Sequence, residues 1–209
     1  MLGLISAHAQ INISPVLLSL KPQDKLTKIE LTNSSNHQRH FQVTIHQWNQ
    51  TEEKESLVEV QDWVISPAIF TIEPGKTQLV RFAPQVKTSQ NQEQSFRVFF
   101  DEIPDRSSTA KGQVTMKLRI SVPLFIESDQ KSQLPLNVRF EKNSLCVFNP
   151  NNHHVELAYL SQGSTKIPLP GYVLSQKSRK FPLKPMDINQ KWQLTFGYLD
   201  GTTSIDVLP

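Results

Sequence analysis

The chain has 209 residues, of which 37% are hydrophobic and 20% charged, so it can build a packed core and is not a disordered polypeptide. Its net charge of +3 comes from basic residues spread singly along the chain, a pattern that argues against nucleic-acid binding. Fourteen prolines against seven glycines suit many short strands joined by rigid turns.

The first nine residues are small and apolar and end in Ala7-His8-Ala9. This is the A-x-A pattern of a signal-peptidase site, so we expect residues 1–9 to be the end of a signal peptide and Gln10 to be the mature N-terminus. The basic and apolar parts that normally precede such a site are missing, which suggests a start codon placed too late. An ordinary chain terminus is the alternative. No later stretch has the length and hydrophobicity of a membrane span.

Short runs of alternating apolar and polar residues follow, with turn signals between them. Strict alternation predicts strands, because successive side chains on a strand point to opposite faces. Seven or eight such strands at regular spacing, without a convincing helix, predict a β-sandwich. The expected strands lie at residues 11–20, 26–32, 41–48, 57–65, 67–72, 77–82, 95–103 and 113–126.

Residues 127–135 are polar and lack periodicity, and we place a linker there. It separates an N-terminal domain at residues 10–126 from a C-terminal domain at residues 136–209. The second domain is also predicted to be all-β, with strands at residues 136–140, 144–148, 155–160, 177–183, 192–199 and 203–207.

The most regular alternation occupies residues 113–126. Its apolar residues fall on even positions and its polar residues on odd positions through the first ten residues. A strand places all the even positions on one face, so this face is either part of the protein's own core or a surface for something else. The five apolar residues of this face are Val114, Met116, Leu118, Ile120 and Val122.

Residues that could carry chemistry are few. The single cysteine, Cys146, excludes an internal disulfide, and we interpret it as an inert buried thiol. His153 and His154 could ligate a metal, but neighbours in sequence point apart at a strand start, which favours a surface loop. Asp101 and Glu102 would likewise face opposite sides of a strand and cannot form a paired acid and base. We therefore expect no enzyme, no metal and no cofactor.

Four segments of the N-terminal domain resemble the PapD-like periplasmic chaperones of the chaperone–usher pilus pathway in order and spacing. They are Ile11–Asn33, Ser66–Phe82, Ser95–Pro104 and the strand that ends in Pro123-Leu124-Phe125. The C-terminal domain matches more weakly, at Leu145–Asn149 and Tyr198–Gly201. The resemblance implies two immunoglobulin-like β-sandwich domains set at an angle, with a cleft between them.

The resemblance also implies a function. Such a chaperone folds and caps pilus subunits and delivers them to an outer-membrane usher, by lending its strand G to a subunit that lacks its own last strand. This donor-strand complementation is an established case of strand addition to a sheet edge. The five even positions are then the donor residues, and we expect them to remain accessible in the free chaperone. Further partners to consider are the usher and a homodimer in which two copies cap each other's strand G.

The positions of the usual carboxylate anchor differ in this chain. Many family members bind the terminal carboxylate of the subunit with a basic residue on the first strand and another on strand G, whereas here these positions are Leu17 and Pro123. The strands around Arg97 and Arg119 are instead similar to the archaic, spore-coat-U-type branch, as are Trp48-Asn49 and Gly171–Ser175.

This branch implies an anchor on strand F, which would be Arg97, with Arg119 as a second candidate. The planar guanidinium of an arginine can donate two hydrogen bonds to one carboxylate. Glu102 and Asp200 match the acidic residues of the family's domain junction, although the basic partner position holds Glu127.

Two other functional classes are also compatible with the sequence. An exported PapD-like sandwich could bind another protein or a glycan, which an aromatic cluster on one exposed face would favour. A β-sandwich hydrolase would instead need a pair of carboxylates about 5–10 Å apart in a cleft. A neighbouring usher gene and pilin-like genes would favour the chaperone.

Overall fold

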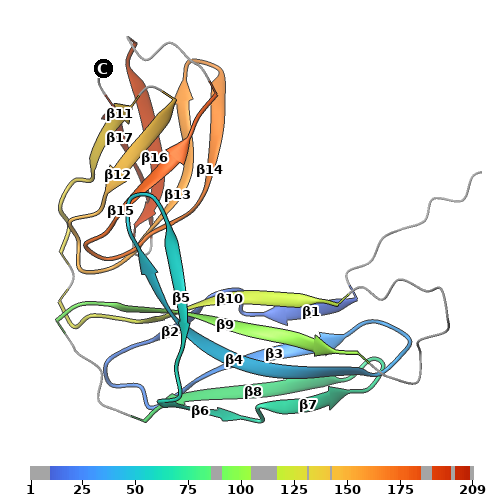
Figure 1. Ribbon diagram of the computed structural model, residues 1–209. Coiled ribbons are helices and arrows are strands. Elements are labelled where there is room, and N and C mark those ends of the chain that lie inside the picture. Colours follow the sequence, from blue (N-terminus) through green and yellow to red (C-terminus); the bar gives the residue numbers. More distant parts are fainter. Residues whose placement is uncertain are drawn as a thin grey trace, which may run out of the picture. The chain divides into compact units, whose positions relative to one another are not determined.

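The computed structural model describes residues 10–85, 91–104, 117–130, 132–141, 143–184, 190–198 and 201–207. Every regular element in these ranges is a β-strand (Figure 1). The predicted all-β class is therefore confirmed for the described chain. None of its segments forms a helix that could cross a membrane.

The chain folds into two compact units. The described residues of the first unit are 10–47, 58–85, 96–104 and 117–125. The second unit begins at Ile126 and also contains two pieces of the N-terminal half, Trp48–Leu57 and the described residues 91–95. The second unit is thus assembled from three separate parts of the sequence.

The first unit has two sheets. One has four strands in the order β1 (Ile11–Ser14), β3 (Thr27–Asn33), β8 (Thr77–Pro84) and β6 (Trp63–Ser66). The other has the order β2 (Leu18–Leu20), β10 (Arg119–Ile126), β9 (Gln94–Ile103), β4 (Arg39–Gln50) and β5 (Glu55–Glu59), with β7 (Ile69–Ile72) also paired to β4. The single strand expected at residues 11–20 is divided around Pro15 into β1 and β2, which lie in different sheets.

The core of the first unit lies between these sheets. Along β9, Phe96, Val98 and Phe100 are buried, while the alternate residues are partly exposed, as a half-buried strand requires. Phe100 meets Phe82 of β8 edge to face, with ring centroids 6.4 Å apart. Because β8 and β9 belong to different sheets, this contact joins the two layers of a sandwich.

The second unit is a smaller sandwich. Its sheets have the orders β11 (Asn137–Glu141), β12 (Ser144–Phe148), β15 (Ser178–Pro182), and β14 (Thr165–Val173), β13 (Val155–Gln162), β16 (Trp192–Tyr198), β17 (Gly201–Val207). One hydrophobic cluster joins both sheets, with Leu145, Val147 and Phe181 on one side and Leu157 and Leu194 among those on the other.

Strand β14 was not predicted from the sequence. It contains Pro168, Pro170 and Gly171, which are all unfavourable inside a sheet. The structure explains their presence, because β14 is an edge strand and its register with β13 shifts between Leu157 and Tyr159. An edge strand tolerates missing N–H donors on its open side.

Candidate functional site

Strand β10 has a long outer edge. It lies between β9 and β2, and β2 has only three residues whereas β10 has eight. A partner of three residues pairs with only part of such a strand, so much of the β10 edge away from β9 extends beyond β2. A strand edge that extends past its neighbour is a place where another strand can add.

The described even positions of this segment differ in their surroundings. Leu118 and Ile120 are half-buried, whereas Val122 is only 2% exposed. Lys117, Arg119 and Ser121, at the odd positions, are exposed. Among the described residues, the accessible part of the apolar face therefore consists of Leu118 and Ile120, and the protein itself encloses Val122. Val114 and Met116 lie outside the described residues.

Arg119 already has a carboxylate partner in its own unit. Its guanidinium donates to Asp101, with Nε to Oδ1 and with Nη2 to Oδ2 at 3.1 Å, and this pairing raises the pKa of Arg119. The guanidinium also lies over the ring of Phe99, 5.2 Å from its centroid. Its side chain is 66% exposed, so the pair is largely solvated.

Arg97 lies on the same face of β9 as Phe99 and Asp101, because the three alternate along the strand. Its Cα partner on β4 is His46, and its side chain is half-buried. The structure therefore places both anchor candidates beside one face of the sheet, Arg97 directly on β9 and Arg119 in contact with Phe99 and Asp101.

Glu102 lies in a buried ion pair within the first unit. Nη1 of Arg39 is 2.5 Å from Oε1 of Glu102, and the two side chains are only 13% and 12% exposed. The other oxygen, Oε2, accepts a hydrogen bond from the backbone N–H of Leu118 at 3.2 Å. Asp200, the other residue matched to a domain junction, lies outside the described residues.

The turn between β4 and β5 packs into the second unit. Trp48 meets Tyr172 edge to face at 5.9 Å, and the side chain of Gln50 donates to the Tyr172 carbonyl and accepts from the Leu174 N–H, both at 2.9 Å. The carbonyl of Glu52 accepts from the Lys180 N–H of β15 at 2.9 Å. Sequence reasoning singled out Trp48-Asn49 and Gly171–Ser175 separately, and the structure brings the two segments into contact.

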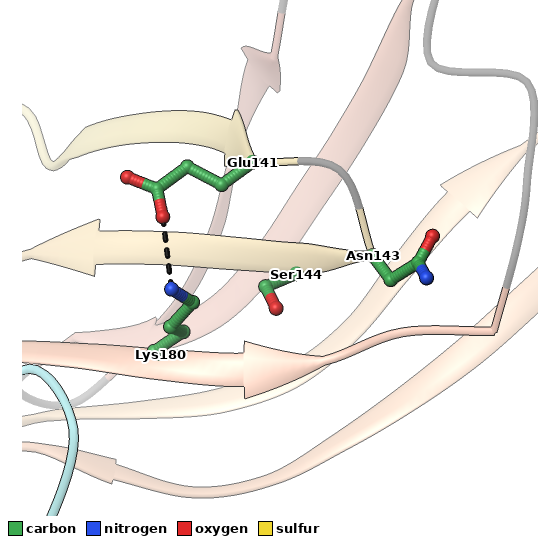
Figure 2. Close-up of a pocket in the computed structure, with 4 residues that line it drawn as sticks. All are labelled: Glu141, Asn143, Ser144 and Lys180. Carbon is green, nitrogen blue, oxygen red and sulfur yellow. Dashed lines mark hydrogen bonds and ion pairs between the residues drawn. The ribbon is translucent and has the colours of Figure 1, made fainter.

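A charged cluster accompanies this packing. Glu141, Asn143, Ser144 and Lys180 line a pocket, and Figure 2 shows the Lys180 ammonium directed at the Glu141 carboxylate, which lies 3.0 Å away. Arg139 pairs with both Glu52, at 2.9 Å, and Glu141, at 3.0 Å. Lys180 and Arg139 lower the pKa of Glu141 to about 2.

Glu52, Glu141 and Cys146 have ligand atoms within 4.8 Å of one another, which is metal-site spacing. Both carboxylates, however, are already neutralised by Arg139 and Lys180. Burial raises the pKa of the Cys146 thiol to about 11, and the Glu141 and Glu52 carboxylates add to the shift, so the thiol stays protonated at neutral pH. Metals bind the thiolate, so this cluster is better suited to holding the β4–β5 turn.

The histidines considered as metal ligands lie in a hydrogen-bonded loop. Nδ1 of His154 is 2.9 Å from the carboxylate of Glu93, whose side chain is almost completely buried. The backbone N–H of His154 also donates to Glu93, at 2.9 Å, and His153 is buried beside it. Glu93 belongs to the segment at 91–95 that the N-terminal half contributes to the second unit, so this pair helps to hold that segment.

Two β-sandwich units, with an alternating apolar pattern at the start of β10, define the class of two-domain, immunoglobulin-like all-β proteins. Residues 10–131 match the family of pili and flagellar-assembly chaperones, by the model of the PapD N-terminal domain. The chain belongs to this family.

One curated relative is the uncharacterized fimbrial chaperone YbgP of Escherichia coli K12. It is 25% identical over 180 residues, which cover 80% of this chain and 72% of the relative.

Solved structures of low sequence identity share the fold. The archaic Csu complex of the chaperone CsuC and the tip subunit CsuE, from Acinetobacter baumannii, contains a chain with a TM-score of 0.77 and 22% identity, with 96% of this chain and 99% of that chain covered. The complex of the pilin SafA with the chaperone SafB, from Salmonella enterica, contains a chain with a TM-score of 0.73 and 13% identity, with 98% of each chain covered.

Proposed function

We propose that this protein is a periplasmic chaperone that captures pilus subunits by donor-strand complementation and passes them to an outer-membrane usher, with no catalytic step. Membership of the pilus-assembly chaperone family supports the chaperone role. The observation that carries the mechanism is β10, whose outer edge extends past β2 and whose residues Leu118 and Ile120 are only half-buried.

The physical basis is the incomplete sandwich of a subunit that lacks its last strand. Such a subunit exposes an apolar groove and a row of unpaired edge amides, both of which promote aggregation. A donated strand pairs with the amides and fills the groove with alternate side chains. Burial of four such side chains would contribute about 6–12 kcal/mol before ordering costs are subtracted.

Leu118 and Ile120 are the described residues that fit this donor role, and Val114 and Met116 continue the same alternation upstream. Val122 is the fifth residue of the set, but it is enclosed in the free protein. We therefore assign most of the groove contact to the four residues before it and treat Val122 as the point where the donor segment enters the chaperone's own core.

The terminal carboxylate of the subunit is assigned to Arg97. Arg119 is engaged with Asp101 in the free protein and remains the second candidate. Arg97 lies on β9, the neighbour of the strand β10 that carries Arg119, and on the same face of the sheet. We also propose that the protein belongs to the archaic branch, because the segments around Trp48 and Tyr172 that resemble this branch are in contact.

The proposal is tested by Leu118→Glu, with Ser121→Glu as the matched control on the exposed face of the same strand. A glutamate at position 118 would place an unpaired carboxylate in the apolar groove of the subunit, which costs several kcal/mol, whereas the half-buried site of the free protein tolerates it better. The assay is co-purification with a pilin-like subunit encoded beside the chaperone gene, together with thermal melting of each purified variant.

We expect subunit yield to collapse for Leu118→Glu and to persist for Ser121→Glu, while both variants melt close to the wild-type temperature. Undiminished subunit yield for Leu118→Glu would overturn the donor assignment. A large drop in its melting temperature would show that Leu118 supports the chaperone's own core, which would also overturn it.

A further inference from the structure

A chain of contacts crosses three neighbouring strands at the beginning of β10. Arg39 lies at the start of β4, Glu102 near the end of β9, and Leu118 directly before β10. Nη1 of Arg39 is 2.5 Å from Oε1 of Glu102, and Oε2 of Glu102 accepts from the Leu118 N–H at 3.2 Å. The backbone N–H of Glu102 in turn donates to the Leu118 carbonyl at 2.9 Å.

Glu102 therefore binds both backbone groups of Leu118. The arrangement resembles one rung of a strand ladder, except that the acceptor for the Leu118 N–H is a carboxylate oxygen and not a backbone carbonyl. The side chains of Glu102 and Arg39 are only 12% and 13% exposed, so movement of the carboxylate would leave a largely buried guanidinium without its carboxylate partner. The contact to Leu118 is thus held in place by a buried charge pair.

The neighbouring pair between Arg119 and Asp101 cannot perform the same task. Its side chains are 66% and 32% exposed, and an exposed pair of this kind contributes little to fixing the backbone. It also holds a side chain, whereas Glu102 holds the backbone N–H of Leu118 itself. Backbone position decides which face of the strand a side chain occupies, and a slip of one residue moves every apolar side chain to the opposite face.

We infer that Glu102, held by Arg39, is a positioning residue for subunit capture. It fixes the backbone at Leu118, the middle of the five donor positions, and so sets the register in which the donor segment is presented. This inference rests on the proposed function. A strand that is already ordered loses less freedom on binding, so the pair should favour capture without touching the subunit.

Two double variants isolate the contact. R39L/E102L and R39L/E102Q both remove the buried ion pair, so neither leaves a lone buried charge. They differ in that glutamine keeps a side-chain oxygen that can accept from the Leu118 N–H, whereas leucine has none. A single variant, Glu102→Asp, serves if R39L/E102L does not fold, because aspartate keeps the charge for Arg39 but is one methylene too short to reach Leu118.

Three quantities are measured for each variant: hydrogen exchange at the Leu118 amide, the melting temperature, and the association rate with the pilin-like subunit encoded beside the chaperone gene. We expect the Leu118 amide of R39L/E102L to exchange at least tenfold faster than that of R39L/E102Q. We also expect its capture of the subunit to be about tenfold slower, with melting temperatures within a few degrees of each other.

Equal capture rates despite faster exchange at Leu118 would overturn the positioning role, because the contact would then be purely structural. Equal exchange rates would overturn it as well, since Glu102 would not be holding Leu118. A wild-type protein that captures no subunit would overturn the proposed function and this inference with it. The exchange comparison needs no subunit, and so the two failures can be told apart.

Discussion

Replacing Gln50 with leucine should destabilise the second unit although the change conserves volume. Gln50 is 3% exposed, and its amide accepts from the Leu174 N–H and donates to the Tyr172 carbonyl. Leucine would leave the buried Leu174 N–H without its acceptor, at a cost of about 1–3 kcal/mol. The Tyr172 carbonyl keeps a hydrogen bond from Arg179 at 3.1 Å. Loss of the hydrogen bond from the Gln50 side chain to this carbonyl therefore adds only about 1 kcal/mol.

The expected total is therefore about 2–4 kcal/mol, or a fall of about 5–10 °C in melting temperature for a chain of this size. Urea unfolding followed by tryptophan fluorescence measures it, because Trp48 lies in the same turn and contacts Tyr172. Asn49→Leu is the control, since Asn49 is the exposed neighbour and its replacement should change stability by less than about 0.5 kcal/mol. A Gln50→Leu variant as stable as the control would refute the assignment of these two bonds.

Three further predictions concern the candidate anchor, the donor strand and the thiol. Arg97→Ala should weaken subunit capture by about tenfold or more while the protein still folds, whereas Arg119→Ala should have a smaller effect; equal effects in a capture assay would count against the ranking. Val122→Glu should unfold the first unit, unlike Leu118→Glu, because it buries an unpaired carboxylate in a site that is 2% exposed; a cooperative melt near the wild-type temperature would contradict this. Cys146 should be alkylated at pH 8 at least about a hundredfold more slowly in the folded protein than in urea, because its pKa rises from 9.0 to about 11; rapid labelling of the folded chain would disprove the shift.

Alternation of apolar and polar residues reliably predicts strands that have one solvent-exposed and one buried face. The strand expected at residues 95–103 corresponds to β9, and its alternate residues Phe96, Val98 and Phe100 are buried on one face, as an alternating pattern indicates. Strand β14 shows the opposite case. Its prolines argue against a strand when only the local sequence is considered. They are tolerated because β14 lies at the edge of its sheet, and the local sequence does not show that position.

Contacts between segments that are distant in the sequence could not be predicted from the local pattern of residues. Gln50 looks like an ordinary polar residue at a strand end, yet it is buried against residues more than a hundred positions away. Asn149 and Asn151 read as a turn signal, and both are completely buried; the Asn149 side chain donates to the carbonyls of His153 and Val173. A buried amide needs partners of matched geometry, and nothing in the local sequence identifies them.

The strand expected at residues 113–126, of which the structure describes residues 117–126, shows what periodicity can and cannot predict at the candidate site. Alternation correctly groups Leu118, Ile120 and Val122 on one face, but it treats the three alike, whereas the structure separates the enclosed Val122 from the half-buried pair. The difference arises from what lies beside each residue, and side-chain period carries no information about neighbours. The same holds for Glu102: its sequence match points to a domain junction, while its described contacts lie on Arg39 and on the backbone of Leu118. A donor strand needs both properties, an apolar face that the sequence displays and a fixed backbone that only the folded neighbours can provide.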